Sequence, residues 1–152
     1  PALPNENWPL FRGTTLAQGI SATDLPVQPE VVWKRTFENE SFESTPVIHN
    51  GVIYIGGLDG PIYALSLADG KTLWTSEIGR AYAHVGVKND VLFTGTNDVP
   101  DFYVYNAATG ERLKTLQLPE PTSSRAAIKG DRVYVGYGIV SPNGGVRAYR
   151  LP

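Results

Sequence analysis

The sequence predicts an all-β fold, a β-propeller whose blades are four-stranded antiparallel sheets. Three observations predict it: segments repeat at a spacing near 40 residues, the apolar residues form short runs without helical periodicity, and the runs are separated by turns rich in Gly, Asn and Asp. Four short strands in a repeat of about 40 residues are typical of a propeller blade. The 152 residues therefore give about three blades.

The repeat is clearest in one β-branched and aromatic run per copy. Val52–Gly56 aligns with Val91–Gly95 at an offset of 39 residues, and Arg132–Gly136 lies 41 residues further on. In each copy a polar turn precedes this run, and a glycine-bearing loop and a third run follow it. The turns are His49–Gly51, Lys88–Asp90 and Lys129–Asp131. The third runs are Ile62–Leu65, Tyr103–Tyr105 and Val146–Tyr149.

Two further features complete the blade pattern. Asn50–Gly51 predicts a type I′ hairpin turn, since both central residues need positive φ, which Asn tolerates and Gly adopts freely. In the first two copies a fourth run follows a Gly-containing turn, at Thr72–Trp74 and Arg112–Lys114. The last copy has three runs, so the sequence predicts an incomplete third sheet.

The chain divides into a leader and the repeats. We expect residues 1–30 to form an N-terminal leader that packs on the propeller, and residues 31–152 to carry the propeller repeats. Trp33 aligns with Trp74, so residues 31–37 have the pattern of a fourth strand and are expected to close the ring. The blades are expected at 44–78, 83–118 and 123–151.

The number of blades constrains the assembly. Propellers have about four to eight blades, so three would curve too tightly to close on themselves. Two explanations stay open: the chain is a piece of a longer propeller, or a homodimer forms a six-bladed ring in which each copy donates Val31–Phe37 to its neighbour's last blade. The second explanation fits closed cyclic symmetry, because a head-to-tail interface that does not close grows into fibres. In both cases we expect the isolated monomer to be unstable, because unpaired strand edges favour aggregation.

Composition narrows the classes of function. The net charge is −2, and 13 scattered basic residues are outnumbered by 15 acidic ones, so nucleic acid is not an expected partner. No apolar stretch reaches the roughly 20 residues of a transmembrane helix. Cysteine is absent, which excludes disulfides, thiolate zinc sites and cysteine nucleophiles. The first residue is Pro rather than Met, so we expect a removed signal peptide and export, or a fragment.

The segment 57–74 resembles the repeat of the pyrroloquinoline-quinone (PQQ)-like propellers, the family of the quinoprotein alcohol dehydrogenases and of BamB-like proteins. In the second copy the position of Trp74 holds Lys114, so the docking contact that this Trp makes between blades is expected to be lost or weakened there. The leader segment Trp8–Gly13 is similar to the W-P-x-F-R-G leader of exported bacterial members. The residues that fit the repeat are Asp59, Gly60, Tyr63, Ala64, Gly70, Lys71 and Trp74, followed in the second copy by Asn106, Thr109, Gly110 and Glu111.

The resemblance implies two different functional groups. One group is the quinoprotein dehydrogenases, which bind PQQ and calcium on the propeller axis and commonly carry a vicinal Cys pair; the other is cofactor-free propellers, including BamB-like scaffolds of outer-membrane protein assembly. This chain has no Cys, and its acidic residues do not form a calcium constellation. We interpret them as solvated loop charges and predict no catalytic residue, no metal site and no cofactor. They are Glu38, Glu40 and Glu43 in one loop and Asp98 and Asp101 in another.

The candidate ligand site lies at the axis. Alignment of the innermost strands places Thr45, His84 and Arg125 at equivalent positions where the strands enter beside the channel, and Arg80 lies just ahead of the second blade. Together they predict a cationic rim able to hold a carboxylate, a phosphate or an acidic peptide side chain. The plainer interpretation is that the His and the Arg bind nearby carbonyls or water.

The other aromatic and histidine residues are interpreted as structural. Trp33 and Trp74 are expected to dock neighbouring blades, and His49 lies in a surface hairpin. Trp8 and Phe11 precede the repeats, so we expect them to pin the leader across a propeller face. Tyr residues that recur in each copy are expected to pack between the sheets.

The sequence therefore favours an exported, non-enzymatic propeller that acts as a binding or scaffolding module for a protein or peptide partner in the bacterial periplasm. Two alternatives stay open. The first is a PQQ- and calcium-dependent quinoprotein dehydrogenase, or a fragment of one. The second is a sensory propeller that binds a small ligand at the His84 and Arg125 rim.

Overall fold

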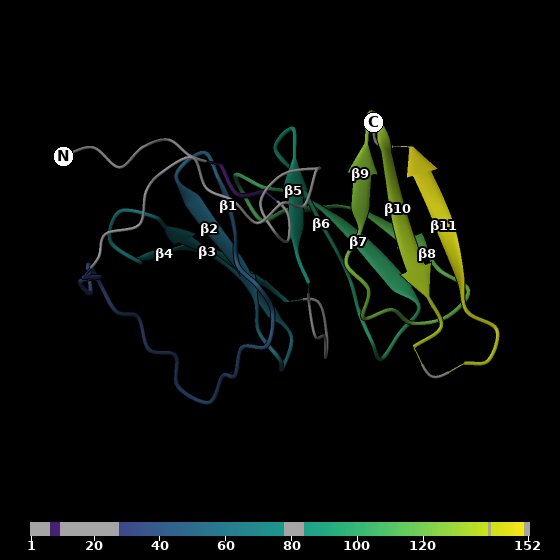
Figure 1. The fold of residues 1–152 in the computed structure, drawn as a ribbon, viewed down its shortest axis with the longest axis horizontal. Helices are drawn as coiled ribbons and strands as arrows, with labels where there is room; N and C mark the ends of the chain where they lie inside the picture. Colours follow the sequence, from purple (N-terminus) through teal and green to yellow (C-terminus); the bar gives the residue numbers. More distant parts are fainter. Residues whose placement is uncertain (1–6, 10–27, 78–83, 140, 151–152) are drawn as a thin grey trace.

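The computed structural model describes residues 7–9, 28–77, 84–139 and 141–150 of the chain. These residues form three antiparallel sheets and no helix, which confirms the all-β prediction (Figure 1). The sheets lie side by side along the molecule in the order of the sequence, as the blades of a partial propeller. No helix of the described residues is long and apolar enough to cross a membrane.

Each sheet is a meander in which consecutive strands pair. Blade 1 has four strands: β1 (Val47–His49), β2 (Val52–Gly56), β3 (Pro61–Ser66) and β4 (Thr72–Glu77). Blade 2 also has four: β5 (Gly86–Lys88), β6 (Val91–Gly95), β7 (Asp101–Asn106) and β8 (Arg112–Gln117). Blade 3 has three: β9 (Ala127–Lys129), β10 (Arg132–Tyr137) and β11 (Gly145–Arg150).

The hairpin turns follow the prediction from their residues. Asn50 and Gly51 have φ of 49° and 75°, and Asn89 and Asp90 have φ of 49° and 58°, so positive φ occupies both central positions of each turn. Blades 1 and 2 also share a shift of register between their third and fourth strands, at Ala64 in the first blade and at the equivalent residue of the second. The repeat in the sequence is therefore a repeat in backbone geometry.

The core lies between the blades. One cluster of buried side chains joins blades 1 and 2, and a second joins blades 2 and 3. Large side chains that are almost fully buried recur at equivalent positions, such as Ile62 of β3 and Phe102 of β7, and Leu92 of β6 packs in the first cluster. Burial of each such side chain contributes about 1.5–3 kcal/mol, so adjacent blades stabilise one another.

Two tryptophans dock on the blade that follows them, Trp74 of β4 on blade 2 and Trp33, from the segment ahead of the sheets, on blade 1. Trp33 Nε1 donates a hydrogen bond to the Leu67 carbonyl at 3.0 Å, and Trp74 Nε1 donates to the Ala107 carbonyl at 3.0 Å. Each indole covers a glycine, because a β-carbon at Gly70 would lie 2.6 Å from Cε3 of Trp33 and one at Gly110 would lie 2.6 Å from Cε3 of Trp74. The tryptophan and the glycine of the repeat thus form one packing contact.

The described part of the leader pairs with the innermost strands. Trp8 forms an antiparallel bridge with Ile48 of β1, with two backbone hydrogen bonds of 2.7 Å. The carbonyl of Pro9 accepts a bond of 3.1 Å from Val87 N of β5, and Asn7 Oδ1 accepts one of 2.9 Å from Asn50 N. These residues were expected across a propeller face, but they run along strand edges because β1 and β5 offer unpaired backbone groups there. The predicted anchor Phe11 lies outside the described residues.

The expected closing strand makes no sheet within the chain. Residues 31–37 form no strand, and the side chains of Val31 and Val32 are 84% and 79% exposed. A fourth strand needs the edge of a third strand, and Figure 1 places this segment at one side of the molecule and β11 at the other. The chain therefore forms an open, partial propeller.

Candidate functional site

Three of the four residues of the predicted rim come together at the axial ends of the blades. Thr45 precedes β1, His84 precedes β5 and Arg125 precedes β9, so each belongs to a different blade. Arg125 Nη2 donates to Thr45 Oγ1 at 3.4 Å, although 80 residues separate them in the sequence. Arg125 is also close enough to His84 to lower the pKa of its imidazole. The fourth predicted residue, Arg80, lies outside the described residues.

The imidazole of His84 is neutral at ordinary pH. Burial lowers the pKa of His84 from its usual value, and the neighbouring Arg125 guanidinium lowers it further. Nδ1 of His84 is buried and has no hydrogen-bond partner among the described residues. The sequence predicts a rim that His84 and Arg125 together make cationic. At neutral pH, however, the positive charge comes from Arg125, and His84 adds charge only when the pH falls.

This arrangement suits an anion. A guanidinium presents five N–H donors in a planar fork that matches a carboxylate or a phosphate, and Thr45 adds a hydroxyl at the same place. An anion bound beside His84 favours the imidazolium, since an opposite charge raises a histidine pKa. These groups therefore match the chemistry of a negatively charged ligand.

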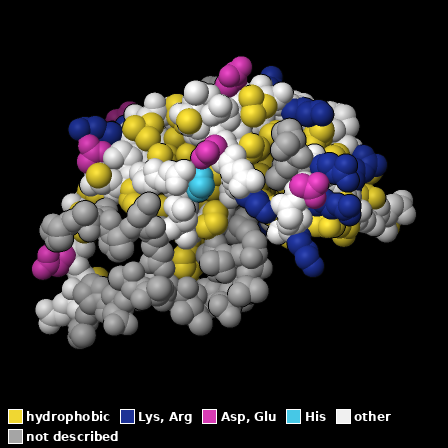
Figure 2. Space-filling view, turned by 90° about the horizontal axis from the view of Figure 1, so that it is seen from above, with side chains coloured by type: hydrophobic (Ala, Val, Ile, Leu, Met, Phe, Trp, Pro, Cys, Tyr) yellow, Lys and Arg dark blue, Asp and Glu magenta, His cyan; other side chains and the backbone are white. Residues whose placement is uncertain are grey.

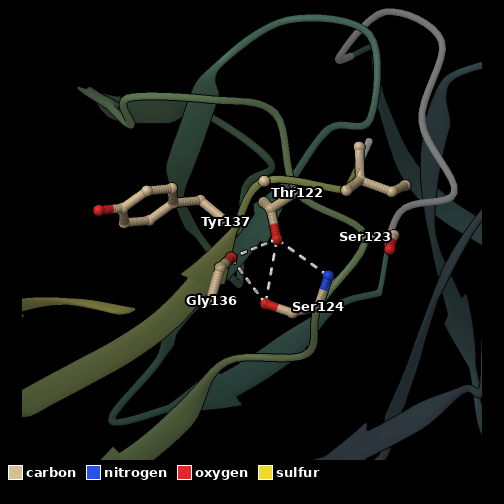
Figure 3. Close-up of a pocket in the computed structure, with 7 residues that line it drawn as sticks. Thr122, Ser123, Ser124, Gly136 and Tyr137 are labelled. Atoms are coloured by element: carbon tan, nitrogen blue, oxygen red, sulfur yellow. Dashed lines mark hydrogen bonds between the residues drawn. The ribbon is translucent and has the colours of Figure 1, made fainter. Parts of the chain in front are cut away.

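A cavity of about 230 Å³ lies next to this rim in blade 3 (Figure 3). The hydroxyls of Thr122 and Ser124 both point to the Gly136 carbonyl, with Oγ1 and Oγ at 2.6 and 2.9 Å from its oxygen, and Ser124 N donates to Thr122 Oγ1 at 2.9 Å. In blade 1 the hydroxyl of Ser44 binds the Gly56 carbonyl in the same way, at 2.8 Å. A serine that recurs at this position fixes the entry to the innermost strand, which is a structural role.

The acidic loop residue Glu40 is held in the structure. Its carboxylate accepts hydrogen bonds from Tyr63 OH at 3.0 Å, from Ser41 N at 3.1 Å and from Asp59 N at 3.4 Å. A β-carbon at Gly57 would lie 2.5 Å from this carboxylate, so a larger residue there would displace the Glu40 side chain. Burial, with the bond to Glu40, raises the pKa of Tyr63. The interpretation of Glu40 as a solvated loop charge is therefore wrong. The recurring tyrosine Tyr63 and the glycine pair Gly56–Gly57 could have indicated a contact there.

The second acidic loop is also structural where the contacts are described. Asp101 accepts a hydrogen bond from Tyr103 OH at 2.8 Å and another from the side-chain amide of Gln117. Within the described residues no group of three or more His, Asp or Glu side chains is placed to hold a metal ion. The described residues therefore do not supply the carboxylate-rich donor set that calcium requires.

The opposite face carries contacts between hairpin turns. His49 Nε2 lies 3.0 Å from Asp90 Oδ1 in the next blade, and Lys88 Nζ donates to the Gly130 carbonyl of the blade after that at 2.7 Å. Figure 2 shows this face from above, with Lys and Arg side chains gathered over blade 3. Among these, Arg150 Nε lies 3.1 Å from Asp131 Oδ2. His49 is therefore part of a contact between blades.

The three sheets and the indole docking between them define a partial β-propeller. A family model described as outer membrane protein assembly factor BamB matches residues 25–81 and 58–150. The chain belongs to this family of PQQ-like repeat proteins.

Two relatives align with it in sequence. The quinohemoprotein alcohol dehydrogenase ADH IIB of Pseudomonas putida is 27% identical in an alignment of 135 positions that covers 78% of this chain and 19% of that protein. The outer membrane protein assembly factor BamB of Legionella pneumophila (strain Paris) is 30% identical over 95 residues, which are 62% of this chain and 24% of that protein. The chain thus spans a quarter or less of the length of either relative.

Solved structures share the fold. A europium-containing methanol dehydrogenase superposes with a TM-score of 0.77 at 16% identity, over 97% of this chain and 30% of that chain. BamB from Moraxella catarrhalis superposes with a TM-score of 0.60 at 21% identity, over 78% of this chain and 35% of that chain. Enzymes and an assembly factor share the architecture, so fold alone does not decide the function.

Proposed function

We propose that this chain is a non-enzymatic binding or scaffolding module, which recognises a protein or peptide partner through its axial face. The observation that carries this proposal is that Thr45, His84 and Arg125 converge from three blades on one position. The carboxylates of Glu40 and Asp101 are held by hydrogen bonds from Tyr63 OH, Tyr103 OH and the Gln117 amide, and we propose a structural role for both. The proposed partner presents an acidic side chain or a terminal carboxylate to Arg125.

The proposal includes a location in the bacterial cell envelope, exported to the periplasm after removal of a signal peptide. The match to a family model and a relative that are both described as outer membrane protein assembly factor supports it. The W-P-x-F-R-G-like leader supports it as well. Expression of the full gene product with an epitope tag, followed by osmotic-shock fractionation, tests the location.

A fluorescent acidic peptide tests the axial site. Fluorescence anisotropy of a labelled Asp/Glu-rich heptapeptide is expected to report binding that Arg125→Gln weakens by about tenfold or more, since a hydrogen bond to a charged group contributes roughly 1.5–3 kcal/mol. Arg132→Gln is the matched control, because Arg132 is exposed at the hairpin-turn end of β10. Equal loss in both variants would show non-specific attraction and contradict the site.

A PQQ- and calcium-dependent dehydrogenase, or a fragment of one, is the second candidate. The alignment to a quinohemoprotein alcohol dehydrogenase over 78% of the chain favours it. Titration of the purified chain with PQQ in the presence of calcium, followed by absorbance, separates the two candidates. A saturable spectral change would favour the dehydrogenase, whereas no change up to millimolar calcium would leave the binding module.

The third candidate is a sensory propeller for a small anionic ligand. The lowered pKa of His84 beside Arg125 favours it, since such an imidazole responds to a nearby charge. Thermal melting with a panel of small carboxylates and phosphates is expected to show stabilisation that His84→Ala/Arg125→Ala removes. If the double variant kept every response, the ligand would bind elsewhere.

A further inference from the structure

A cavity of about 430 Å³ lies between blades 2 and 3, away from the axial rim. Its walls are mainly apolar and come from β7, β8, β10 and β11. Phe102, Val104 and Val133 are almost fully buried, with 1%, 5% and 0% exposure. The ring of Tyr149 is stacked on that of Phe102, with centroids 6.1 Å apart and planes at 4°. The lining residues are Phe102, Val104, Leu113, Lys114, Leu116, Val133, Tyr149 and Arg150.

The first junction of the same chain shows what normally fills this space. Ile62, Ala64, Leu92 and Tyr105 hold the repeat positions of Phe102, Val104, Val133 and Tyr149, and they form the core between blades 1 and 2 with Trp74 packed against them. At the second junction the position of Trp74 is taken by Lys114. The second junction therefore shares the strand walls of the first, with an ammonium side chain at the position of the indole. The Ala107 carbonyl and Gly110, which the Trp74 indole contacts, have no counterpart among the described residues of blade 3.

The charges at the cavity favour an anion. Lys114 is exposed, and no hydrogen bond or ion pair joins its ammonium group to another described residue. Arg150 is the second basic residue of the lining, and Asp131 binds its guanidinium at 3.1 Å. No Asp or Glu belongs to the described lining, so its charged side chains are the two basic ones, and Lys114 is the one without an acidic partner among the described residues. A ligand that complements these features has an aromatic body and one carboxylate.

We propose that this cavity is a binding site for a small aromatic carboxylate. The ring lies between Phe102, Val104 and Val133, in the space that the Trp74 indole occupies at the first junction, and the carboxylate pairs with the Lys114 ammonium. The volume suits one bicyclic ring system with a short acid chain. This cavity is separate from the axial rim, and the proposal does not depend on the function proposed for that rim.

Indole-3-propionate and its neutral analogue 3-methylindole are the probes, used with the full chain in isothermal titration calorimetry. The parent is expected to bind both. Lys114→Met keeps the length of the side chain and removes its charge, so it is expected to weaken indole-3-propionate roughly fivefold, as an exposed ion pair predicts, and to leave 3-methylindole unchanged. Lys34→Met, a lysine outside the cavity lining, is the matched control and should change neither.

Lys114→Trp restores the residue of the first junction and fills the cavity. We expect it to abolish binding of both probes and to raise the melting temperature, because the indole then covers Phe102 and Val133. Leu113→Trp, from the same lining, repeats the test if the first variant does not fold. Absence of saturable binding by the parent, unchanged binding by the filled variants, or equal weakening of both probes by Lys114→Met would overturn the proposal.

Discussion

At the scale of single residues, the half-buried imidazole of His84 is expected to make the stability of the chain depend on pH. Its folded-state pKa is lowered by burial and by Arg125, whereas the unfolded chain titrates near the usual histidine value of about 6.5. Between these two values the unfolded state binds more protons, so the free energy of unfolding falls as the pH falls. The loss begins below about pH 6.5 and is complete below the folded-state pKa.

Replacement of His84 tests this dependence. Urea unfolding followed by tryptophan fluorescence is expected to show that the parent loses stability between pH 7 and pH 5 and that His84→Gln loses less. His49→Gln is the control, since His49 lies in the contact with Asp90 and its removal should leave the loss caused by His84. Identical pH profiles for the parent and His84→Gln would show that the imidazole is not buried in solution.

Two buried tyrosines differ in one contact. Tyr54 OH donates to the Ala107 carbonyl at 3.1 Å, whereas Tyr105 OH is buried without a partner among the described residues. Burial raises the pKa of both phenols to about 12. We predict that Tyr105→Phe raises the free energy of unfolding by about 1 kcal/mol and that Tyr54→Phe lowers it by about 1 kcal/mol. Urea midpoints measure both, and equal signs for the two variants would contradict the assignment of their hydroxyls.

At the scale of elements, the indole and the glycine it covers act as one contact between blades. Gly110 has φ of 74° and lies under Trp74, whereas Gly51 has φ of 75° and open space around its α-carbon. Alanine costs about 1–2 kcal/mol at either position because of the left-handed backbone. The difference between the two variants therefore measures the clash of the new methyl group with the Trp74 indole. We predict that Gly110→Ala lowers the free energy of unfolding by about 1–3 kcal/mol more than Gly51→Ala does. Equal losses in chemical unfolding would show that the indole does not pack on Gly110.

The elements could be predicted from the sequence wherever they recur in each copy of the repeat. The strand runs, the type I′ turns and the axial position of Thr45 and Arg125 follow from alignment of the copies, because equivalent residues occupy equivalent places in each blade. The carboxylate pocket of Glu40 was not predictable in this way. It forms where a loop outside the repeat crosses Gly57, and contacts between such loops depend on the packed structure rather than on periodicity. The pairing of Trp8 with Ile48 was missed for the same reason.

At the scale of the whole molecule, the segment 31–37 at one side and the free edge of β11 at the other are complementary (Figure 1). Trp33 docks on blade 1 of its own chain in the way that Trp74, in the fourth strand of blade 1, docks on blade 2. The backbone of residues 31–37, however, forms no strand. At the far side, β11 is the last strand of a three-stranded sheet, and its Val146 is 73% exposed. We propose that a segment equivalent to Val31–Phe37 completes blade 3, and that it comes from a second copy or from further blades.

The register of blade 1 makes this proposal testable. Trp74 pairs with Ala64 and Thr75 with Tyr63, so the same register in blade 3 places Trp33 opposite Ala148 and Lys34 opposite Arg147. The chain lacks cysteine, so a mixture of Lys34→Cys and Arg147→Cys chains can form a disulfide only between the two new residues or between like chains. If a second copy supplies the strand, oxidation of the mixture should give a mixed dimer in preference to either like dimer.

Light scattering of the parent should then give a mass near twice 16.5 kDa. Added salt should strengthen the association, because the register brings the like charges of Lys34 and Arg147 together and salt screens their repulsion. A monomer that forms no mixed disulfide would instead assign the missing strand to further blades of a longer chain. In that case the axial site of Thr45, His84 and Arg125 is one arc of a larger rim, and its ligand also contacts residues that those blades provide.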